Sequence, residues 1–228
     1  MSSLRHEVLA ANLALKSHGL VTLTWGNVSA IDRDRGVVAI KPSGVDYGEM
    51  TVDDIVVLDL DGQLLEGSRR PSSDTPTHLA LYRRYPQLGA VAHTHSTWAT
   101  AWAQAGREIP LLGTTHADLS PHPIPLTREL TAEEVERGYE AATAEVLIEA
   151  VGSRPPLSVP CVLARGHGPF CWGPGAAAAV AAAVTLEEVA RLALLTTVLD
   201  PAGPGLAEFV RDKHFTRKHG PGAYYGQG

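Results

Sequence analysis

Cysteine is scarce in this chain: two residues, Cys161 and Cys171, occur among 228. They form no C-x-x-C pair and no disulfide framework. The sequence therefore excludes the disulfide-stapled class of small folds, and the stability of the chain must come from an apolar core. A hydrophobic content of 44% is enough to build one.

Long apolar runs are also missing. The alanine-rich run over 176–184 is shorter than the ~18 residues that a membrane span needs, and Glu187 and Glu188 follow it. The first residues, MSSLRHEVLAANLALKSHG, lack the apolar core of a signal peptide. We therefore expect a soluble cytoplasmic protein that has no membrane partner.

The chain has no excess of positive charge. Its 19 Lys and Arg residues against 25 Asp and Glu residues give a formal charge of −6. Proteins that bind nucleic acid usually present a basic face, so we expect no nucleic-acid partner. An anionic substrate is still allowed, because a local pocket can oppose the net charge.

Linkers, repeats and nucleotide-binding glycine motifs are absent too. Neither G-x-x-x-x-G-K-[ST] nor G-x-G-x-x-G occurs, which argues against nucleotide binding. No Ser/Gly-rich segment or charge block divides the chain. We predict a single domain over residues 1–228.

Strand and helix patterns alternate along that domain, which predicts an α/β fold. Apolar residues at helical spacing predict a helix from Leu4 that ends near Gly19. Further helices are predicted over 72–86, 131–151, 175–199 and 206–219. The helix over 131–151 would begin with a capping box formed by Thr131 and Glu134. Strands are predicted in GVVAIK, DIVVLDL, LGAVAH and PCVLARGHGPF.

Two histidines end the third predicted strand. Side chains two residues apart on a strand share a face, so His93 and His95 would project together, as two ligands of one metal ion do. Catalytic zinc takes three protein ligands and keeps one position open. The first candidate for the third ligand is His167, whose flanking glycines leave room for a substrate. The spacing leaves open His78, His116, His214 and His219.

Three loops of small residues are candidates for anion binding. TWGNVSA, KPSGVDY and RRPSSDTPTH each place Gly, Ser or Asn where backbone N–H groups can face a ligand. Ser72 and Ser73 precede a predicted helix N-terminus, which attracts anions, and Lys41 could add charge. Together with a metal site, these loops suggest a phosphorylated small molecule.

These stretches together resemble the class II aldolase/adducin family. The resembling residues, in order, are EVLAANLALKSHGLVTLTWGNVSAIDRDRGVVAIKPSGVDY, PSSDTPTHLALYRRYP, HTHSTWATAWAQAG, GTTHAD, HGPFCWG and DKHFTRKHGPGAYYGQ. They span nearly the whole chain. The resemblance is weakest over 119–123 and 152–160.

The resemblance implies a three-layer α/β/α sandwich with a central, largely antiparallel sheet, assembled as a homotetramer. It implies one Zn2+ per subunit, for which Mn2+ or Co2+ could substitute. The implied metal positions are His93, His95, His167 and Asp74. The implied substrate-binding positions are Asn27, Lys41, Ser43, Gly44, Ser72, Ser73, Thr114, Glu140 and His214.

The chemistry implied is the epimerisation of a phosphorylated pentulose. L-Ribulose 5-phosphate would break between carbons 3 and 4, the aldehyde fragment would rotate, and re-addition would yield D-xylulose 5-phosphate. Asp118 and Tyr225 match the acid/base pair of the family, one on each face of the aldehyde. The match is to epimerases of arabinose catabolism, although the sequence does not separate these from ascorbate or other pentose routes.

Two alternatives within the family remain. An aldolase of the L-fuculose-1-phosphate type would carry glutamate where this chain has Asp74, which favours the epimerase. An adducin-like scaffold without metal is disfavoured by the intact histidines.

Tyr225 lies close to the C-terminus, after Gly220, Pro221 and Gly222. A tail this short is not expected to fold back with precision by itself. We therefore expect His214 and Tyr225 of one subunit to complete the metal site of its neighbour, where they would meet that neighbour's Asp118.

Overall fold

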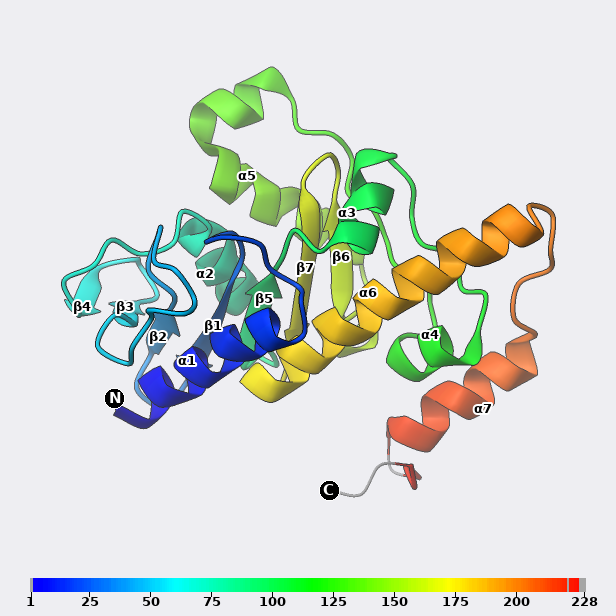
Figure 1. The fold of residues 1–228 in the computed structure, drawn as a ribbon, viewed down its shortest axis with the longest axis horizontal. Coiled ribbons are helices and arrows are strands. Elements are labelled where there is room, and N and C mark those ends of the chain that lie inside the picture. Colours follow the sequence, from blue (N-terminus) through cyan, green and yellow to red (C-terminus); the bar gives the residue numbers. More distant parts are fainter. Residues whose placement is uncertain (1, 221, 226–228) are drawn as a thin grey trace.

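The computed structural model describes residues 2–220 and 222–225 (Figure 1). The strands are β1 (Asn27–Asp32), β2 (Val37–Ile40), β3 (Val56–Asp59), β4 (Leu64–Glu66), β5 (Ala90–His93), β6 (Cys161–Ala164) and β7 (Gly168–Gly173). The helices are α1 (Ser2–Ser17), α2 (Thr75–Arg84), α3 (Thr97–Gln104), α4 (Thr114–Leu119), α5 (Ala132–Val151), α6 (Ala176–Leu199) and α7 (Glu208–Lys218), with a short 3-10 turn, η1 (Pro156–Ser158).

The strands form one seven-stranded sheet in the order β4-β3-β2-β1-β5-β7-β6. Every neighbouring pair of strands in it is antiparallel. The strand that carries His93 is therefore central, between β1 and β7, and not an edge strand. The expected α/β class with an antiparallel sheet is confirmed.

Helices cover both faces of this sheet. Side chains of α1, α3 and α6 share one apolar core with alternate residues of the strands, such as Val28 and Ala30 of β1. Side chains of α2 and α5 share a second core with strand residues that point to the opposite face of the sheet, such as Ile31 and Val91. Figure 1 shows α6 running across the front of the sheet, with α4 and α7 packed beyond it. Alternate strand residues thus face opposite sides of the sheet, and the helices on each side complete the three expected layers.

Most predicted elements are present, but the central strand β1 was missed. Its sequence, NVSAID, reads as a polar loop because Asn27 and Ser29 interrupt the apolar pattern. The Ser29 hydroxyl is buried, and its oxygen lies 2.7 Å from both His78 Nδ1 and Tyr82 Oη. A buried polar group is tolerated when it is hydrogen-bonded, so tertiary contacts allow a strand that the local pattern hides. The predictions also lacked β4, α3 and α4.

The capping box of α5 is confirmed. The Thr131 side chain accepts a hydrogen bond from the Glu134 amide, and the Glu134 carboxylate accepts one from the Thr131 amide. The helix ends at Val151, before Gly152 at φ 64°. Gly138, at φ 150°, interrupts the helix just before Tyr139 and Glu140. Within the described residues, no helix is long and apolar enough to cross a membrane.

Candidate metal centre and substrate pocket

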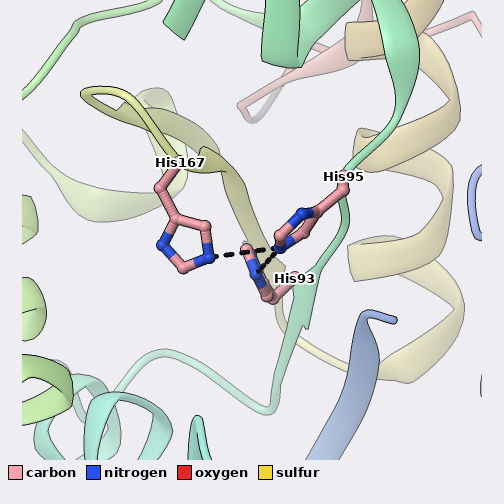
Figure 2. Close-up of side chains that lie close together, drawn as sticks. All are labelled: His93, His95 and His167. Carbon is pink, nitrogen blue, oxygen red and sulfur yellow. Dashed lines mark hydrogen bonds between the residues drawn. The ribbon is translucent and has the colours of Figure 1, made fainter. Parts of the chain in front are cut away.

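Three imidazoles converge at one end of the sheet. His93 ends β5, His95 follows it, and His167 lies in the turn between β6 and β7. The Nε2 atom of His95 lies 3.1 Å from Nε2 of His93 and 3.1 Å from Nε2 of His167. Figure 2 shows the three rings turned toward one another. Antiparallel pairing of β5 with β7 is what brings residues so far apart in sequence together.

The protonation state of these rings suits metal binding. His93 Nδ1 lies 3.0 Å from the Pro169 carbonyl, which can only accept, so Nδ1 carries the proton and Nε2 keeps its lone pair. Burial lowers the pKa of His93. Burial, followed by the neighbouring His93 and His95, lowers the pKa of His167 to about 4. The rings are therefore neutral near pH 7, as ligands must be.

The spacing also fits a metal ion. Two imidazole nitrogens on a tetrahedral zinc lie about 3.3 Å apart, given Zn–N bonds of about 2.05 Å. Among the described residues, His93, His95 and His167 form the group of three donors that could hold an ion, with ligand atoms within 4.8 Å of one another. His95 is exposed and His93 buried, so an ion held there would be open on one side.

Asp74 lies beside this group, as the N-cap residue of α2. Its Oδ2 accepts a hydrogen bond of 2.7 Å from the Asn27 side-chain amide, and it makes no capping bond to its own helix. Burial opposes ionisation of Asp74, but His93, His78 and the Asn27 hydrogen bond outweigh it and lower the pKa. The carboxylate is therefore charged next to the three imidazoles, while the prediction that it ligates the metal stays a prediction.

A cavity of about 370 Å³ opens next to the histidines. Eleven of the predicted site residues line it: Asn27, Lys41, Ser43, Gly44, Ser72, Ser73, Asp74, His93, His95, Glu140 and His167. They come from the three small-residue loops, the end of β5 with the residues after it, the β6–β7 turn and α5. The structure thus collects the predicted metal and anion residues in one place.

Two groups in this cavity have unused hydrogen-bonding capacity. The Asn27 side-chain oxygen is buried without a partner, although its amide nitrogen contacts Asp74 and Ser72. The Lys41 ammonium donates to the carbonyl oxygens of Thr24 and Pro42 at 3.2 and 3.3 Å, so one of its three hydrogens is left. Burial lowers the pKa of Lys41. An anion with hydroxyl groups would satisfy both residues.

Tyr139 also belongs to this site and was missed by sequence reasoning. Its phenol oxygen lies 3.1 Å from His167 Nδ1, where it can accept a hydrogen bond from Nδ1–H and so keep the Nε2 lone pair free for a metal. It lines the same cavity as Glu140. The break in α5 at Gly138 was a signal in the sequence, because a glycine inside a helical pattern often has a structural reason.

Gly168 has a different role from the one expected. We predicted that the glycines beside His167 leave room for a substrate. A Cβ on Gly168 would instead lie 2.6 Å from the Thr94 carbonyl, whereas one on Gly166 would meet nothing within 4 Å. Gly168 therefore lets β7 approach the residues that follow β5, which sets the position of His167.

The remaining histidines make other contacts. His78 is fully buried against Ser29, and His116 Nε2 donates to the His122 carbonyl at 3.0 Å. His214 and His219 both contact Asp118. Of the five candidates for the third ligand, the structure brings His167 alone into the group with His93 and His95.

Asp118, His214 and Tyr225 form a second cluster, which does not line the histidine cavity. Asp118 on α4 pairs with His214 and Arg217 of α7, at 3.1 and 2.7 Å. Burial opposes ionisation of Asp118, but hydrogen bonds from Arg217 and His214 outweigh it and lower the pKa. Thr114 begins α4, but it takes no part in the ion pairs of Asp118 and does not line the cavity. Figure 1 shows α4 and α7 well away from the β6–β7 turn.

Two residues of the tail, Tyr224 and Tyr225, contact α7. The Arg217 carbonyl accepts hydrogen bonds from the amides of Tyr224 and Tyr225, and the Arg217 guanidinium lies 4.3 Å from the centre of the Tyr225 ring. We expected so short a tail not to fold back by itself, yet Tyr224 and Tyr225 contact α7 of their own chain. The structure also places Tyr225 in the same cluster as Asp118 of its own chain.

Comparisons with known proteins agree with the fold. The chain is 58% identical over 227 residues, covering all of both chains, to "L-ribulose-5-phosphate 4-epimerase UlaF" of Salmonella paratyphi B. Among solved structures, an L-fuculose 1-phosphate aldolase matches 95% of this chain and 96% of its own, with TM-score 0.80 and 24% identity. An l-fuculose-1-phosphate aldolase from Thermus thermophilus matches 89% of this chain and 100% of its own, with TM-score 0.69 and 26% identity.

A sequence model of the class II aldolase and adducin N-terminal domain matches residues 6–194. This range contains α2 to α5, the whole sheet and all three converging histidines. The chain belongs to the class II aldolase/adducin family.

Proposed function

We propose that the chain is a metal-dependent L-ribulose-5-phosphate 4-epimerase that forms D-xylulose 5-phosphate. The observation that carries the proposal is the convergence of three neutral imidazoles at the mouth of a polar cavity. The full-length identity of 58% to a curated epimerase selects the reaction within the family.

His93, His95 and His167 would hold a divalent cation, with Asp74 as a further ligand. Zinc is proposed, and manganese or cobalt could replace it, because geometry and availability decide metal selectivity. Such an ion supplies a Lewis acid for the negative charge that develops when the bond between carbons 3 and 4 breaks.

The small-residue loops would bind the substrate. Ser43, Gly44, Ser72 and Ser73 lie around the cavity with Lys41, and the phosphate is proposed to bind among them. The unpaired Asn27 side-chain oxygen would accept a hydrogen bond from a sugar hydroxyl. Glu140, Thr114 and His214 are proposed as further polar contacts. A firmly held phosphate would keep the aldehyde fragment in place while its carbonyl rotates.

Asp118 and Tyr225 would transfer the protons. One would take the proton from the hydroxyl on carbon 4, and the other would donate its own proton to the alkoxide that forms on the opposite face. Because their cluster does not line the histidine cavity of its own chain, we propose that it faces the cavity of a neighbouring subunit in a homotetramer. Domain 1–228 would then lend its C-terminal tail to the next subunit's site.

An aldolase acting on L-fuculose 1-phosphate is the second candidate, since such enzymes share the fold. Asp74 favours the epimerase. Its carboxylate is held by Asn27 at 2.7 Å, a distance that the longer glutamate side chain would alter. The cytoplasmic location and the arabinose pathway stay predictions.

Incubation of the purified protein with L-ribulose 5-phosphate tests the proposal directly. We expect D-xylulose 5-phosphate to form, the activity to be lost with a chelator, and zinc to restore it. L-Fuculose 1-phosphate is the matched second substrate. Release of an aldehyde from it, with no change in L-ribulose 5-phosphate, would favour the aldolase.

A further inference from the structure

One arginine binds the carboxylate proposed for proton transfer. Arg217 of α7 donates two parallel hydrogen bonds to Asp118 of α4, from Nε to Oδ1 at 3.1 Å and from Nη2 to Oδ2 at 2.7 Å. A two-point contact between planar groups fixes the rotation of the carboxylate as well as its place. The Asp118 side chain is 13% exposed, so water competes little for this contact.

The same residue holds the tyrosine. The Arg217 guanidinium lies over the Tyr225 ring at 4.3 Å from its centre, within the range of a cation–π contact. The Arg217 carbonyl accepts hydrogen bonds from the amides of Tyr224 and Tyr225 at 2.9 and 3.0 Å. Terminal residues are usually poorly ordered unless they are tied down. Here the side chain and the backbone of one residue tie the tail to α7.

We infer that Arg217 is a positioning residue that sets the Asp118 carboxylate and the Tyr225 phenol relative to each other. This inference rests on the proposed function, in which the two groups serve opposite faces of one aldehyde. Groups with that task must keep a constant separation, and a shared guanidinium between them provides it. Without Arg217, each group would move independently of the other.

Lys218 also approaches both groups. Its ammonium lies 3.7 Å from the Asp118 carboxylate and 4.9 Å from the centre of the Tyr225 ring. An ammonium is a point charge and does not fix the rotation of a carboxylate as a guanidinium fork does. We therefore assign the positioning of both groups to Arg217. The substitution Arg217→Lys keeps the positive charge but removes the two-point contact, so it distinguishes the effect of charge from that of geometry.

Arg217→Gln and Arg217→Lys test the inference, with Arg211→Gln as the matched control. Arg211 lies on the same helix, but its partners Glu208 and Asp212 belong to α7 itself. For Arg217→Gln we expect kcat to fall about 10²-fold, as for a misplacement of about 1 Å, with KM and metal content little changed. Arg217→Lys should recover part of kcat, and Arg211→Gln should resemble wild type.

A double-mutant cycle then shows whether Arg217 acts through the two groups. We expect the effect of Arg217→Gln on kcat to shrink in the Asp118→Asn background and in the Tyr225→Phe background. Effects that multiply fully in both backgrounds would mean that Arg217 only docks α7 on α4, and would overturn the inference.

Hydrogen exchange of the C-terminal peptide provides a measurement that needs no activity. In the assembled protein, exchange at Tyr224 and Tyr225 should be faster in Arg217→Gln than in wild type or Arg211→Gln. Unchanged exchange would overturn the inference, whatever happens to kcat. If wild type fails to convert L-ribulose 5-phosphate, the proposed function falls, and exchange alone decides whether Arg217 anchors Tyr225.

Discussion

The smallest unit of the proposed chemistry is the group of three imidazoles. His93, His95 and His167 point their Nε2 atoms at a common centre, and the Pro169 carbonyl fixes the tautomer of His93. Removing one ring leaves two imidazoles and the proposed Asp74 carboxylate, one donor fewer to hold the ion.

His95→Asn should therefore lose metal. We expect zinc well below one equivalent per chain, and activity reduced more than about 10²-fold, since even loss of an outer hydrogen-bond partner of a metal ligand costs 10–100-fold. Metal analysis after dialysis measures the first effect. His18→Asn, at an exposed position on another part of the surface, is the control. Full zinc content in His95→Asn would contradict the proposed site.

Ser73 tests the anion pocket in the same way. Ser73→Asp places a negative charge on the cavity wall, where it should repel a phosphate. We expect KM to rise at least about tenfold, equivalent to about 1.4 kcal/mol of binding free energy, with kcat less affected. Ser68→Asp adds the same charge at an exposed position outside the cavity. Equal KM values for the two variants would refute phosphate binding at Ser73.

At the scale of elements, the turn between β6 and β7 determines where His167 lies. Gly168→Ala would bring a Cβ within 2.6 Å of the Thr94 carbonyl, a backbone atom that cannot move cheaply. We expect a loss of about 1–3 kcal/mol in the free energy of unfolding, as for other overpacked sites, and weaker metal binding. Denaturant unfolding and metal titration measure the two effects.

Gly205→Ala is the control for Gly168→Ala, because its Cβ would come no closer than 3.4 Å to the Leu111 carbonyl. Wild-type stability and metal affinity in Gly168→Ala would show that β7 does not need the close approach.

Helix α4 carries a buried histidine that makes stability depend on pH. Burial lowers the pKa of His116 to about 4, against an ordinary value of 6.5. Below pH 6.5 the unfolded chain takes up a proton that the folded chain refuses until about pH 4. The contribution of neutral, buried His116 to the free energy of unfolding is therefore lost as the pH falls through this window, by up to about 1.4 kcal/mol per pH unit.

Denaturant unfolding of metal-free protein at pH 7 and pH 5 measures this loss. We expect the difference between the two pH values to be smaller in His116→Gln than in wild type, and unchanged in His18→Gln, where the histidine is exposed. An equal pH dependence in wild type and His116→Gln would mean that His116 is not buried in the neutral form.

At the scale of the whole molecule, the question is which chains build one site. The sequence-based expectation divided Asp118 and Tyr225 between neighbours, but both lie around Arg217 of one chain. If this cluster serves the histidine cavity of the next subunit, metal ligands come from one chain and both proton-transfer groups from another. Refolded mixtures of inactive variants test that division.

A mixture of His95→Asn and Tyr225→Phe should regain up to about a quarter of wild-type activity, since about one site in four would combine two intact halves in a cyclic assembly. A mixture of Asp118→Asn and Tyr225→Phe should stay inactive, because no single chain supplies both groups. Recovery in the second mixture would place Asp118 with the metal ligands of its own chain. No recovery in either would mean that sites are not shared.

Local residue patterns were sufficient for much of this protein. The spacing of apolar residues predicted α1, α2, α5 and α6, and Thr131 with Glu134 predicted the start of α5. The pair His93 and His95 was visible because residues two apart on an extended chain share a face. The small-residue loops marked the cavity wall. Such features depend on neighbours in sequence, which local backbone geometry brings together.

Other features depend on residues far apart in sequence, and only the tertiary structure decided them. Antiparallel pairing of β5 with β7 chose His167 over four other histidines. The buried contacts of Ser29 turned a polar segment into the central strand β1. The packing of α7 on α4 gathered Asp118 and Tyr225 around Arg217. Each depends on the free energy of burying and pairing distant groups, which no local pattern of residues contains.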